Sequence, residues 1–215
     1  MVTLAADDRC ISVADAVAAP LTVTASADSL KTSSLQEEIV AILFGDALNF
    51  SALNEAQLPL FLEHFVGLVA TVRDSSGIQP LSQNTWGDGL YLVYKTVGDA
   101  GRVALQLSDS ISGMNWATKG LPTDMNIRIG LHAGPTFACV DPITARPNYM
   151  GAHVSRAARF EPITPPGQVY ASEAFAALVA ATRVREFECE YVGLRPLAKG
   201  YGTFGTYHLR HRRNQ

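Results

Sequence analysis

The order of hydrophobic patterns along the chain predicts one α/β (α+β) domain, whose elements follow one another as β-α-β-β-α-β, with a C-terminal extension. Three observations support this prediction. A continuous apolar run at 39–46 is typical of a strand buried on both faces. Two amphipathic helical patterns, at 54–73 and 97–112, enclose a hairpin signal at 86–89 (WGDG). Residues 126–134 then alternate polar and apolar, as a half-buried strand does, and complete this ferredoxin-like order.

Each predicted element has a local cause in the sequence. The first helix repeats apolar residues at helical spacing, and Pro59 lies early in it, where proline is tolerated. The second helix repeats apolar residues at every fourth position. Short strands are expected on either side of the turn, at 78–84 and 90–94. We further expect a long loop at 141–150, a helix near 153–160, a strand at 168–171, a helix from Ser172, and strands at 187–192 and 206–209.

The composition of the 215 residues divides the chain into three parts. With 47% hydrophobic and 17% charged residues, the chain can build a core and is neither disordered nor fibrous. Residues 1–38 contain no aromatic side chain, so we expect an N-terminal arm, with an alternating run near Leu21 that is typical of an edge strand. Residues 39–210 are expected to form the main domain, and 211–215 a basic tail.

Charge and cysteine content exclude several classes of protein. Seventeen Lys and Arg against twenty Asp and Glu give a formal net charge of -3, which indicates no nucleic-acid-binding surface. No apolar stretch is long enough to cross a membrane, and acidic residues among the first twenty argue against a signal peptide. Cys10, Cys139 and Cys189 lie far apart and predict free thiols in a reducing compartment. We therefore expect a cytoplasmic protein.

Two aspartates are candidate metal ligands. Asp46 closes the first strand and Asp88 lies at the tip of the hairpin, and these two elements are neighbours in the predicted sheet. Carboxylates that lie close together repel unless a cation is placed between them, and hard oxygen ligands suit Mg²⁺ or Mn²⁺ bound with a nucleoside triphosphate. The alternative is that Asp46 caps a helix and Asp88 is an ordinary turn residue.

Six motifs, in order from 43 to 202, resemble those of class III nucleotidyl cyclase catalytic domains. They are 43–51 (LFGDALNFS), 85–90 (TWGDGL), 126–134 (NIRIGLHAG), 151–161 (GAHVSRAARFE), 166–172 (PGQVYAS) and 199–202 (KGYG). Each motif is weak by itself, but together they are specific. The resemblance implies the class III cyclase fold and an enzyme that converts a nucleoside triphosphate to a 3′,5′-cyclic monophosphate and pyrophosphate.

The resemblance also implies roles for individual residues. The metal aspartates of the family fall on Asp46 and Asp88, and its metal-binding backbone carbonyl falls on Ala47, with two Mg²⁺ or Mn²⁺ ions per site. The transition-state arginine falls on Arg159. Ser155 stands where the family has a transition-state asparagine, and its hydroxyl can still donate one hydrogen bond.

The resemblance places the substrate contacts as well. Lysine at the terminal-phosphate position is replaced by Tyr201, with Lys199 two residues away, and Arg146 falls in the loop over the triphosphate. Both base-reading positions are asparagines, Asn84 and Asn148. A carboxamide offers donors and an acceptor, which match the polar edge of uracil or cytosine.

A pyrimidine is the favoured base for a second reason. The bulky side chains of Phe50, Trp86 and Tyr149 lie near the base-reading positions in sequence and are expected to narrow the cavity. The segments at 84–88 (NTWGD) and 161–167 (EPITPPG) are also similar to the pyrimidine cyclases of bacterial Pycsar anti-phage systems. That similarity implies a uridylate cyclase whose product, cUMP, is a second messenger read by a separate effector protein; CTP is the next choice.

Two alternatives stay open. Ser155 and Tyr201 favour a regulatory cyclase-homology domain that binds a nucleotide without turning it over. A purine cyclase is the other alternative, because carboxamides also contact adenine or guanine edges.

In the family the metal and transition-state residues come from different protomers, which implies a homodimer. Among other polar residues, His132 is expected to be a packed core histidine, and Ser172 shows no sequence sign of a hydrolase triad.

Overall fold

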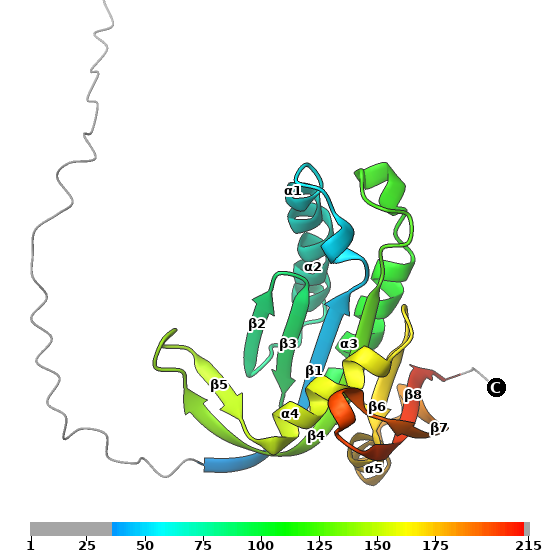
Figure 1. The fold of residues 1–215 in the computed structure, drawn as a ribbon. Coiled ribbons are helices and arrows are strands. Elements are labelled where there is room, and N and C mark those ends of the chain that lie inside the picture. Colours follow the sequence, from blue (N-terminus) through cyan, green and yellow to red (C-terminus); the bar gives the residue numbers. More distant parts are fainter. Residues whose placement is uncertain (1–35, 213–215) are drawn as a thin grey trace, which may run out of the picture. The chain divides into compact units, whose positions relative to one another are not determined.

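An eight-stranded sheet organises residues 36–212, the part of the chain that the computed structural model describes (Figure 1). The strand order is β2-β3-β1-β4-β6-β8-β7, and β5 pairs with β4. The strands are β1 (Gln36–Ala47), β2 (Ser82–Trp86), β3 (Gly89–Tyr94), β4 (Ile127–Val140), β5 (Pro147–Met150), β6 (Val169–Ser172), β7 (Phe187–Pro196) and β8 (Thr203–His211). The expected edge strand near Leu21, most of the arm, Cys10 and residues 213–215 lie outside the described residues.

The helices connect these strands in the expected order. They are α1 (Leu58–Leu60), the π-helical η4 (Phe61–Val66), α2 (Gly67–Ser75), α3 (Val97–Ser112), α4 (Ala152–Phe160) and α5 (Glu173–Ala181). Short 3₁₀ turns are η3 (Phe50–Ala52), η5 (Trp116–Lys119), η6 (Glu161–Ile163) and η7 (Ala198–Gly200). The helix expected at 54–73 thus begins only at Leu58 and contains a wider π turn, across which Phe61 and Phe65 stack with ring centroids 4.8 Å apart.

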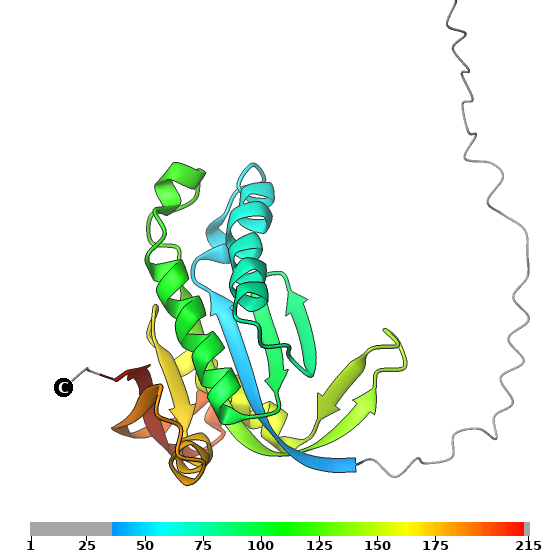
Figure 2. The same ribbon diagram turned by 180° about the vertical axis from the view of Figure 1, so that it is seen from behind.

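The sheet is covered on both faces. Helices α2 and α3 pack on one face, seen in front in Figure 2, and α4 packs on the other. β1 supplies side chains to both: Ala41 and Leu43 face α2 and α3, while Val40 and Ile42 face the side of α4. All four are at most 1% exposed, which confirms the prediction of a strand buried on both faces. The β-α-β-β-α-β order of the predicted fold is confirmed as well.

The expected loop at 141–150 is instead the end of a hairpin. β4 continues to Val140 and pairs with β5, so that Phe137 lies opposite Met150. The turn is closed by Asp141, whose Oδ1 accepts hydrogen bonds from the backbone amides of Ile143 and Thr144 at 2.8 and 3.0 Å. The prediction of a loop holds for the turn at 141–146 but was wrong for 147–150, because a strand of four residues is too short to show a periodic pattern and is defined by its pairing with β4.

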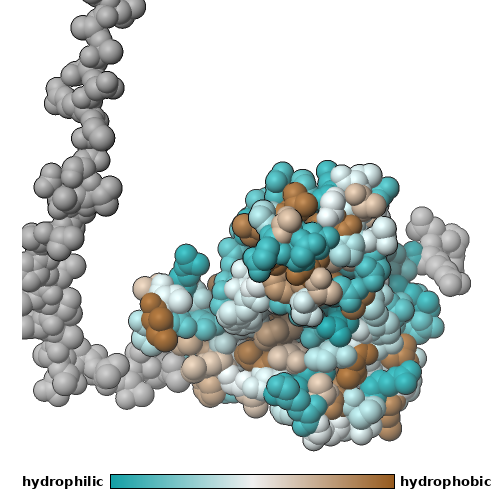
Figure 3. Space-filling view, turned by 45° about the horizontal axis from the view of Figure 1, so that its top comes forward, coloured by the Kyte–Doolittle hydropathy of each residue, from teal (hydrophilic) through white to brown (hydrophobic). Residues whose placement is uncertain are grey.

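The β4–β5 hairpin exposes apolar side chains. It projects from the body of the domain in Figure 1, and Figure 3 shows hydrophobic surface on it. Ile143 is 93% exposed, and Val140 and Met150 are also exposed. Cys139 on this hairpin and Cys189 on β7 are free and half-buried, as expected. No helix among residues 36–212 is long and apolar enough to cross a membrane.

A buried histidine joins three elements. His132 on β4 is 1% exposed, which confirms a packed core position. Its Nδ1 lies 2.7 Å from Ser172 Oγ, and its Nε2 lies 2.8 Å from Nδ1 of His153 on α4. A histidine beside Ser172 was not predicted from the sequence, but a hydrolase triad also requires an acid. Ser172 caps α5, because its Oγ accepts a hydrogen bond from the backbone amide of Phe175. The cluster of His132, His153 and Ser172 contains no acid, so we interpret it as structural.

The stability of the fold is expected to decrease as the pH falls from 6.5 towards 3. Burial, aided by the charges of His153 and Arg156, lowers the pKa of His132 from 6.5 to about 3. Between these values the unfolded chain binds a proton at His132 that the folded chain does not. The free energy of unfolding therefore falls by up to about 1.4 kcal/mol per pH unit from this residue, whereas above pH 6.5 it contributes no slope.

Urea unfolding at pH 7, 5 and 4 measures this dependence. His132→Gln is expected to flatten it, whatever its own cost in stability, while the control His64→Gln on η4 keeps the wild-type slope. Equal slopes in the wild type and His132→Gln would show that other groups cause the pH dependence.

Candidate active site

The two predicted metal aspartates lie side by side. Asp46 is the second-last residue of β1 and pairs with Gly89, the residue directly after Asp88. The amide of Ala47 donates to the carbonyl oxygen of Asp88 at 3.3 Å. Gly87 has a φ of 67° and allows the tight turn that presents Asp88 at the end of β2 and β3. Asp46 lies within a strand, so the alternative of a helix cap is excluded for it, whereas Asp88 is a turn residue.

The pKa of Asp88 lies above its usual value, mainly because the carboxyl group is partly buried and in part because Asp46 is close. Partial burial raises this pKa, and the charge of Asp46 and a hydrogen bond to it raise it further, against opposing effects of a backbone hydrogen bond and of Arg128. A divalent cation would relieve the repulsion between Asp46 and Asp88, and two carboxylates with a nearby backbone carbonyl are the hard oxygen donors that Mg²⁺ and Mn²⁺ take. The residues present therefore fit such an ion.

In the described part of the chain, few further metal-binding side chains surround the pair of Asp46 and Asp88. Within residues 36–212, no group of three or more His, Cys, Asp or Glu side chains is arranged to hold a metal ion. Mg²⁺ is commonly held by one or two carboxylates together with substrate phosphates and water. The aspartate pair thus resembles a metal site that is completed by a nucleotide.

Arg128 and Glu161 complete the charges of the site, and the sequence reasoning missed both. Arg128 lies opposite Asp46 in the β1–β4 ladder, and its Nη2 is 2.5 Å from Asp46 Oδ2. Its Nε is 3.1 Å from Glu161 Oε1, at the start of η6. Burial raises the pKa of Glu161 to about 7; the Arg128 guanidinium opposes this shift, and the charges of Asp46 and Asp88 add to it. Arg128 lies in the motif at 126–134 and Glu161 in the motif at 151–161, so these motifs are the signal from which both residues could have been identified.

The α4 helix presents Ser155 and Arg159 on a surface of its own. Its buried residues are Ala157 and Phe160, which anchor it to the sheet. Ser155 is exposed and Arg159 is half-buried, one helical turn further on. Among the described residues, no hydrogen bond or ion pair joins either side chain to Asp46 or Asp88. Within the described part of the chain, the predicted catalytic residues of α4 are therefore not in direct polar contact with the metal aspartates.

Asn84 lies on an open aromatic face of the sheet. It pairs with Tyr91, whose ring packs against Phe44 at 5.0 Å and Trp86 at 6.0 Å between centroids. Trp86 is 57% exposed. The Oδ1 of Asn84 accepts the amide of Thr85 at 2.9 Å, which leaves the amino group of the carboxamide to face outward as a donor.

Asn148 lies on the neighbouring hairpin and has the same local geometry. Its Oδ1 accepts the amide of Tyr149 at 2.8 Å. The hairpin leans on the β2–β3 edge through two bonds, from Ser82 Oγ to the carbonyl of Pro147 at 3.0 Å and from Tyr91 Oη to the carbonyl of Tyr149 at 3.2 Å. The structure therefore brings the elements that carry the two asparagines together, although it shows no direct contact between their side chains.

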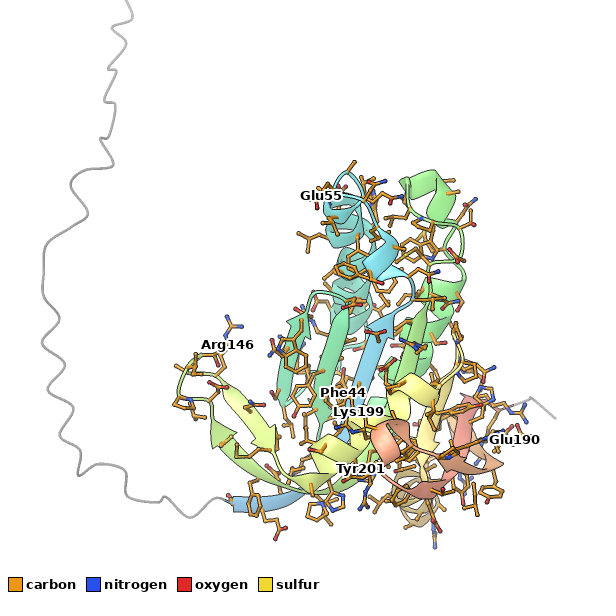
Figure 4. The ribbon with its side chains drawn as sticks, in the orientation of Figure 1. Phe44, Glu55, Arg146, Glu190, Lys199 and Tyr201 are labelled. Carbon is orange, nitrogen blue, oxygen red and sulfur yellow. The ribbon has the colours of Figure 1, made fainter. Side chains whose placement is uncertain are left out.

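Other predicted substrate contacts are distributed unevenly. Arg146, at the tip of the hairpin in Figure 4, lines a cavity of about 220 Å³ together with Asn84 and Arg73. Phe50 is half-buried, and its ring packs on Phe61 at 4.8 Å, against the core beneath α2 and α3. The ring also lies beside the turn that carries Asp88, since a Cβ atom placed on Gly87 would be 3.6 Å from its Cε1.

Lys199 and Tyr201 lie on the loop between β7 and β8. This loop contains η7, which packs against α4 (Figure 4). Lys199 is exposed with a φ of 61°, and Tyr201 is half-buried. These two side chains therefore share a neighbourhood with the helix that carries Ser155 and Arg159.

The family of this fold is shown by comparison with known proteins. The model of the adenylate and guanylate cyclase catalytic domain matches residues 33–211, and the chain belongs to that family. It is a nucleotidyl cyclase catalytic domain of class III. A comparison with curated protein sequences finds no match.

Solved structures confirm the class III fold. The guanylate cyclase domain of RhGC from Catenaria anguillulae in complex with GTP is 23% identical, with a TM-score of 0.68 over 83% of this chain and 100% of that chain. The catalytic core of a rhodopsin-guanylyl cyclase with converted specificity, in complex with ATPalphaS, is 24% identical, with a TM-score of 0.67 over 83% and 99%. The adenylyl cyclase CyaB from P. aeruginosa is 17% identical, with a TM-score of 0.67 over 83% and 96%.

Proposed function

We propose that this chain is a metal-dependent pyrimidine nucleotide cyclase that converts UTP to cUMP and pyrophosphate, with CTP as the second choice. The observation that carries the proposal is the pair of carboxamides, Asn84 and Asn148, at both base-reading positions. We further propose that the domain acts as the cyclases of Pycsar anti-phage systems do, so that its product is a second messenger in bacterial antiviral defence and a separate effector protein responds to it.

The proposed reaction is an attack of the ribose 3′-oxygen on the α-phosphorus, with pyrophosphate as the leaving group. Two bound Mg²⁺ or Mn²⁺ ions would lower the pKa of the 3′-hydroxyl and neutralise the negative charge of the phosphates. Asp46, Asp88 and the carbonyl of Ala47 are assigned to hold them. The ion pair with Arg128 fixes the carboxylate of Asp46 before substrate arrives, which is the kind of preorganisation that catalysis requires.

The remaining residues are assigned to the phosphates. Arg159 offsets the negative charge that builds on the α-phosphate oxygens, and Ser155 donates one hydrogen bond beside it. Lys199, Tyr201 and Arg146 are assigned to the terminal phosphates. Cationic and hydroxyl donors suit phosphate oxygens, which only accept hydrogen bonds.

The direction of the two carboxamides favours uracil. Both Oδ1 atoms accept the next backbone amide, so the amino groups are the donors that remain, and that of Asn148 lies close to the carboxylate of Asp141. Uracil presents a carbonyl oxygen at position 4, which accepts such a bond, whereas cytosine carries an amino group there, which is itself a donor and cannot pair with another amino group. The exposed ring of Trp86 lies on the same face and limits the room for a two-ring base.

The separation of the site residues supports a homodimer with shared sites. Asp46 and Asp88 are clustered, while no hydrogen bond or ion pair within the described residues joins the side chains of Ser155 and Arg159 to them, so one chain shows only part of the constellation in contact. The exposed apolar side chains of the β4–β5 hairpin supply surface that a second copy would bury. We propose that each site takes its metal aspartates from one protomer and Ser155 and Arg159 from the other.

The alternative function is a nucleotide-binding regulatory domain, favoured by Ser155 and Tyr201 in place of the residues of the family. A purine cyclase is the other alternative. Incubating the purified protein with Mn²⁺ and each of UTP, CTP, GTP and ATP, followed by mass spectrometry of the products, distinguishes all three. We expect cUMP as the main product; cGMP or cAMP alone indicates a purine cyclase, and binding without any product indicates the regulatory domain.

Asn148→Asp is expected to reduce kcat/KM for UTP by about tenfold or more while the affinity for inorganic triphosphate stays unchanged. A carboxylate only accepts hydrogen bonds and so repels the carbonyl oxygens of uracil. Asn84→Asp is expected to act in the same way. The measurement is the ratio of kcat/KM among UTP, CTP and GTP, with Asn54→Asp in an exposed turn as the matched control. An unchanged ratio in both variants would refute the base-reading assignment.

A further inference from the structure

Arg156 stands next to Ser155 on α4 but points towards β8. Its Cζ lies 5.2 Å from the centroid of the Phe204 ring, which is a cation–π distance. Its Nε is buried and has no hydrogen-bond partner among the described residues. The aromatic ring is therefore a main partner of this guanidinium, and the contact joins α4 to the start of β8.

Phe204 in turn supports the loop that precedes it. The ring of Tyr201 lies 6.2 Å away between centroids. A Cβ atom placed on Gly202 would be 3.0 Å from Cε2 of Phe204, so the ring lies tightly against the backbone there. The amide of Leu197 donates to the carbonyl of Gly202 at 2.8 Å and closes the loop at its base.

This loop holds an unusual backbone conformation. Lys199, Gly200 and Gly202 have φ values of 61°, 67° and 115°. A left-handed conformation is unfavourable for a lysine and persists only where the surroundings impose it. The surroundings here are the closing hydrogen bond at Leu197, the Phe204 ring, and α4 behind that ring.

We propose that Arg156 is a positioning residue that, through Phe204, fixes the Lys199–Tyr201 loop to α4. This contact holds the groups for the α-phosphate, Ser155 and Arg159, at a set distance from those for the terminal phosphates, Lys199 and Tyr201. The proposal rests on the proposed function, from which these phosphate contacts come. It assigns to Arg156 a role that requires no direct contact between this residue and the substrate.

The contact predicts a specific kinetic effect. Because the loop contacts the terminal phosphates in both the ground state and the transition state, its displacement removes uniform binding, and KM for UTP rises more than kcat falls. Removing the cation–π contact should weaken the binding of inorganic pyrophosphate by roughly threefold to thirtyfold. Pyrophosphate carries no base and no ribose, so its affinity reports on the phosphate contacts, and neither Arg156→Gln nor Phe204→Leu alters the other phosphate contacts, Arg146 and the metal aspartates.

The experiment compares Arg156→Gln and Phe204→Leu with wild type in the full-length protein with Mn²⁺. Pyrophosphate affinity is measured by calorimetry and as product inhibition, and thermal unfolding reports folding. Arg156→Lys and Phe204→Tyr, which keep the cation and the ring, should restore most of the affinity. The double variant Arg156→Gln/Phe204→Leu should be no worse than either single variant. Arg102→Gln on α3 is the matched control and should bind as wild type does.

The outcomes separate the two proposals. Wild-type pyrophosphate affinity in both folded single variants, or additive losses in the double variant, overturns the positioning role. If Arg156→Gln fails to fold, the comparison of Phe204→Leu with Phe204→Tyr decides, and equal affinities overturn it. A wild-type protein that makes no cyclic nucleotide refutes the proposed function, while the calorimetric affinities still test the loop.

Discussion

Replacing Asp46 or Asp88 by alanine is expected to abolish the formation of cyclic nucleotide while the protein keeps its fold. Each carboxylate supplies one side of the cation site, and loss of metal-assisted catalysis is expected to lower turnover by about three orders of magnitude or more. The measurement is cUMP formation from UTP at saturating Mn²⁺, with circular dichroism as the check of folding. Asp109→Ala on α3 is the control and should retain activity.

The two variants should differ in stability, which makes the test sharper. Asp88 has a pKa raised by burial and by its neighbour, so its removal relieves repulsion and leaves the free energy of unfolding unchanged or slightly higher. Asp46 is paired with Arg128 at a site that is about a quarter exposed, so its removal costs up to about 1 kcal/mol. Undiminished turnover in either variant would contradict the assignment of these residues to the metal site.

Mixing inactive Asp46→Ala and Arg159→Ala chains restores activity if each site is shared between two protomers. A mixed dimer contains one site with both lesions and one site with neither. With statistical exchange, half of the dimers are mixed, and activity recovers to at most about a quarter of the wild-type value. The measurement is cyclase activity after subunit exchange, which is followed independently by mass spectrometry of the dimers.

The control for this experiment is a mixture of Asp46→Ala with Asp88→Ala. Both lesions lie in the same half of the site, so every site of a mixed dimer carries one lesion and activity stays absent. Recovery in this control would mean that the two aspartates serve different sites. Absence of recovery in the first mixture, despite proven exchange, would mean that each site is built within one chain.

Local patterns were sufficient to predict the centre of the fold. The apolar run of β1 and the WGDG turn placed Asp46 and Asp88 at the same end of neighbouring strands, and the structure confirms this. Each of these features is set by a few adjacent residues: burial on both faces requires a continuous apolar strand, and a positive φ at Gly87 favours glycine. Such features can be read without knowledge of the distant parts of the chain.

Features that join distant segments were not predictable in this way. Register in the β1–β4 ladder puts Arg128 opposite Asp46, and the end of α4 then brings Glu161 to the same guanidinium. His132 met Ser172 only because β4 and β6 are parallel neighbours in the sheet. These contacts depend on register and strand order, which follow from the packing of the whole domain.

The sequence by itself determined the order of elements, the class III motifs and the paired aspartates, because each depends on short-range patterns. Only the tertiary structure decided which side chains share a surface. It packed Phe50 on Phe61 beside the turn that carries Asp88, paired 147–150 with β4 in a hairpin, and placed Arg156 over the ring of Phe204. The physical reason is that a side chain goes where burial and charge are best satisfied among neighbours that are remote in sequence, and the sequence does not state which neighbours those are.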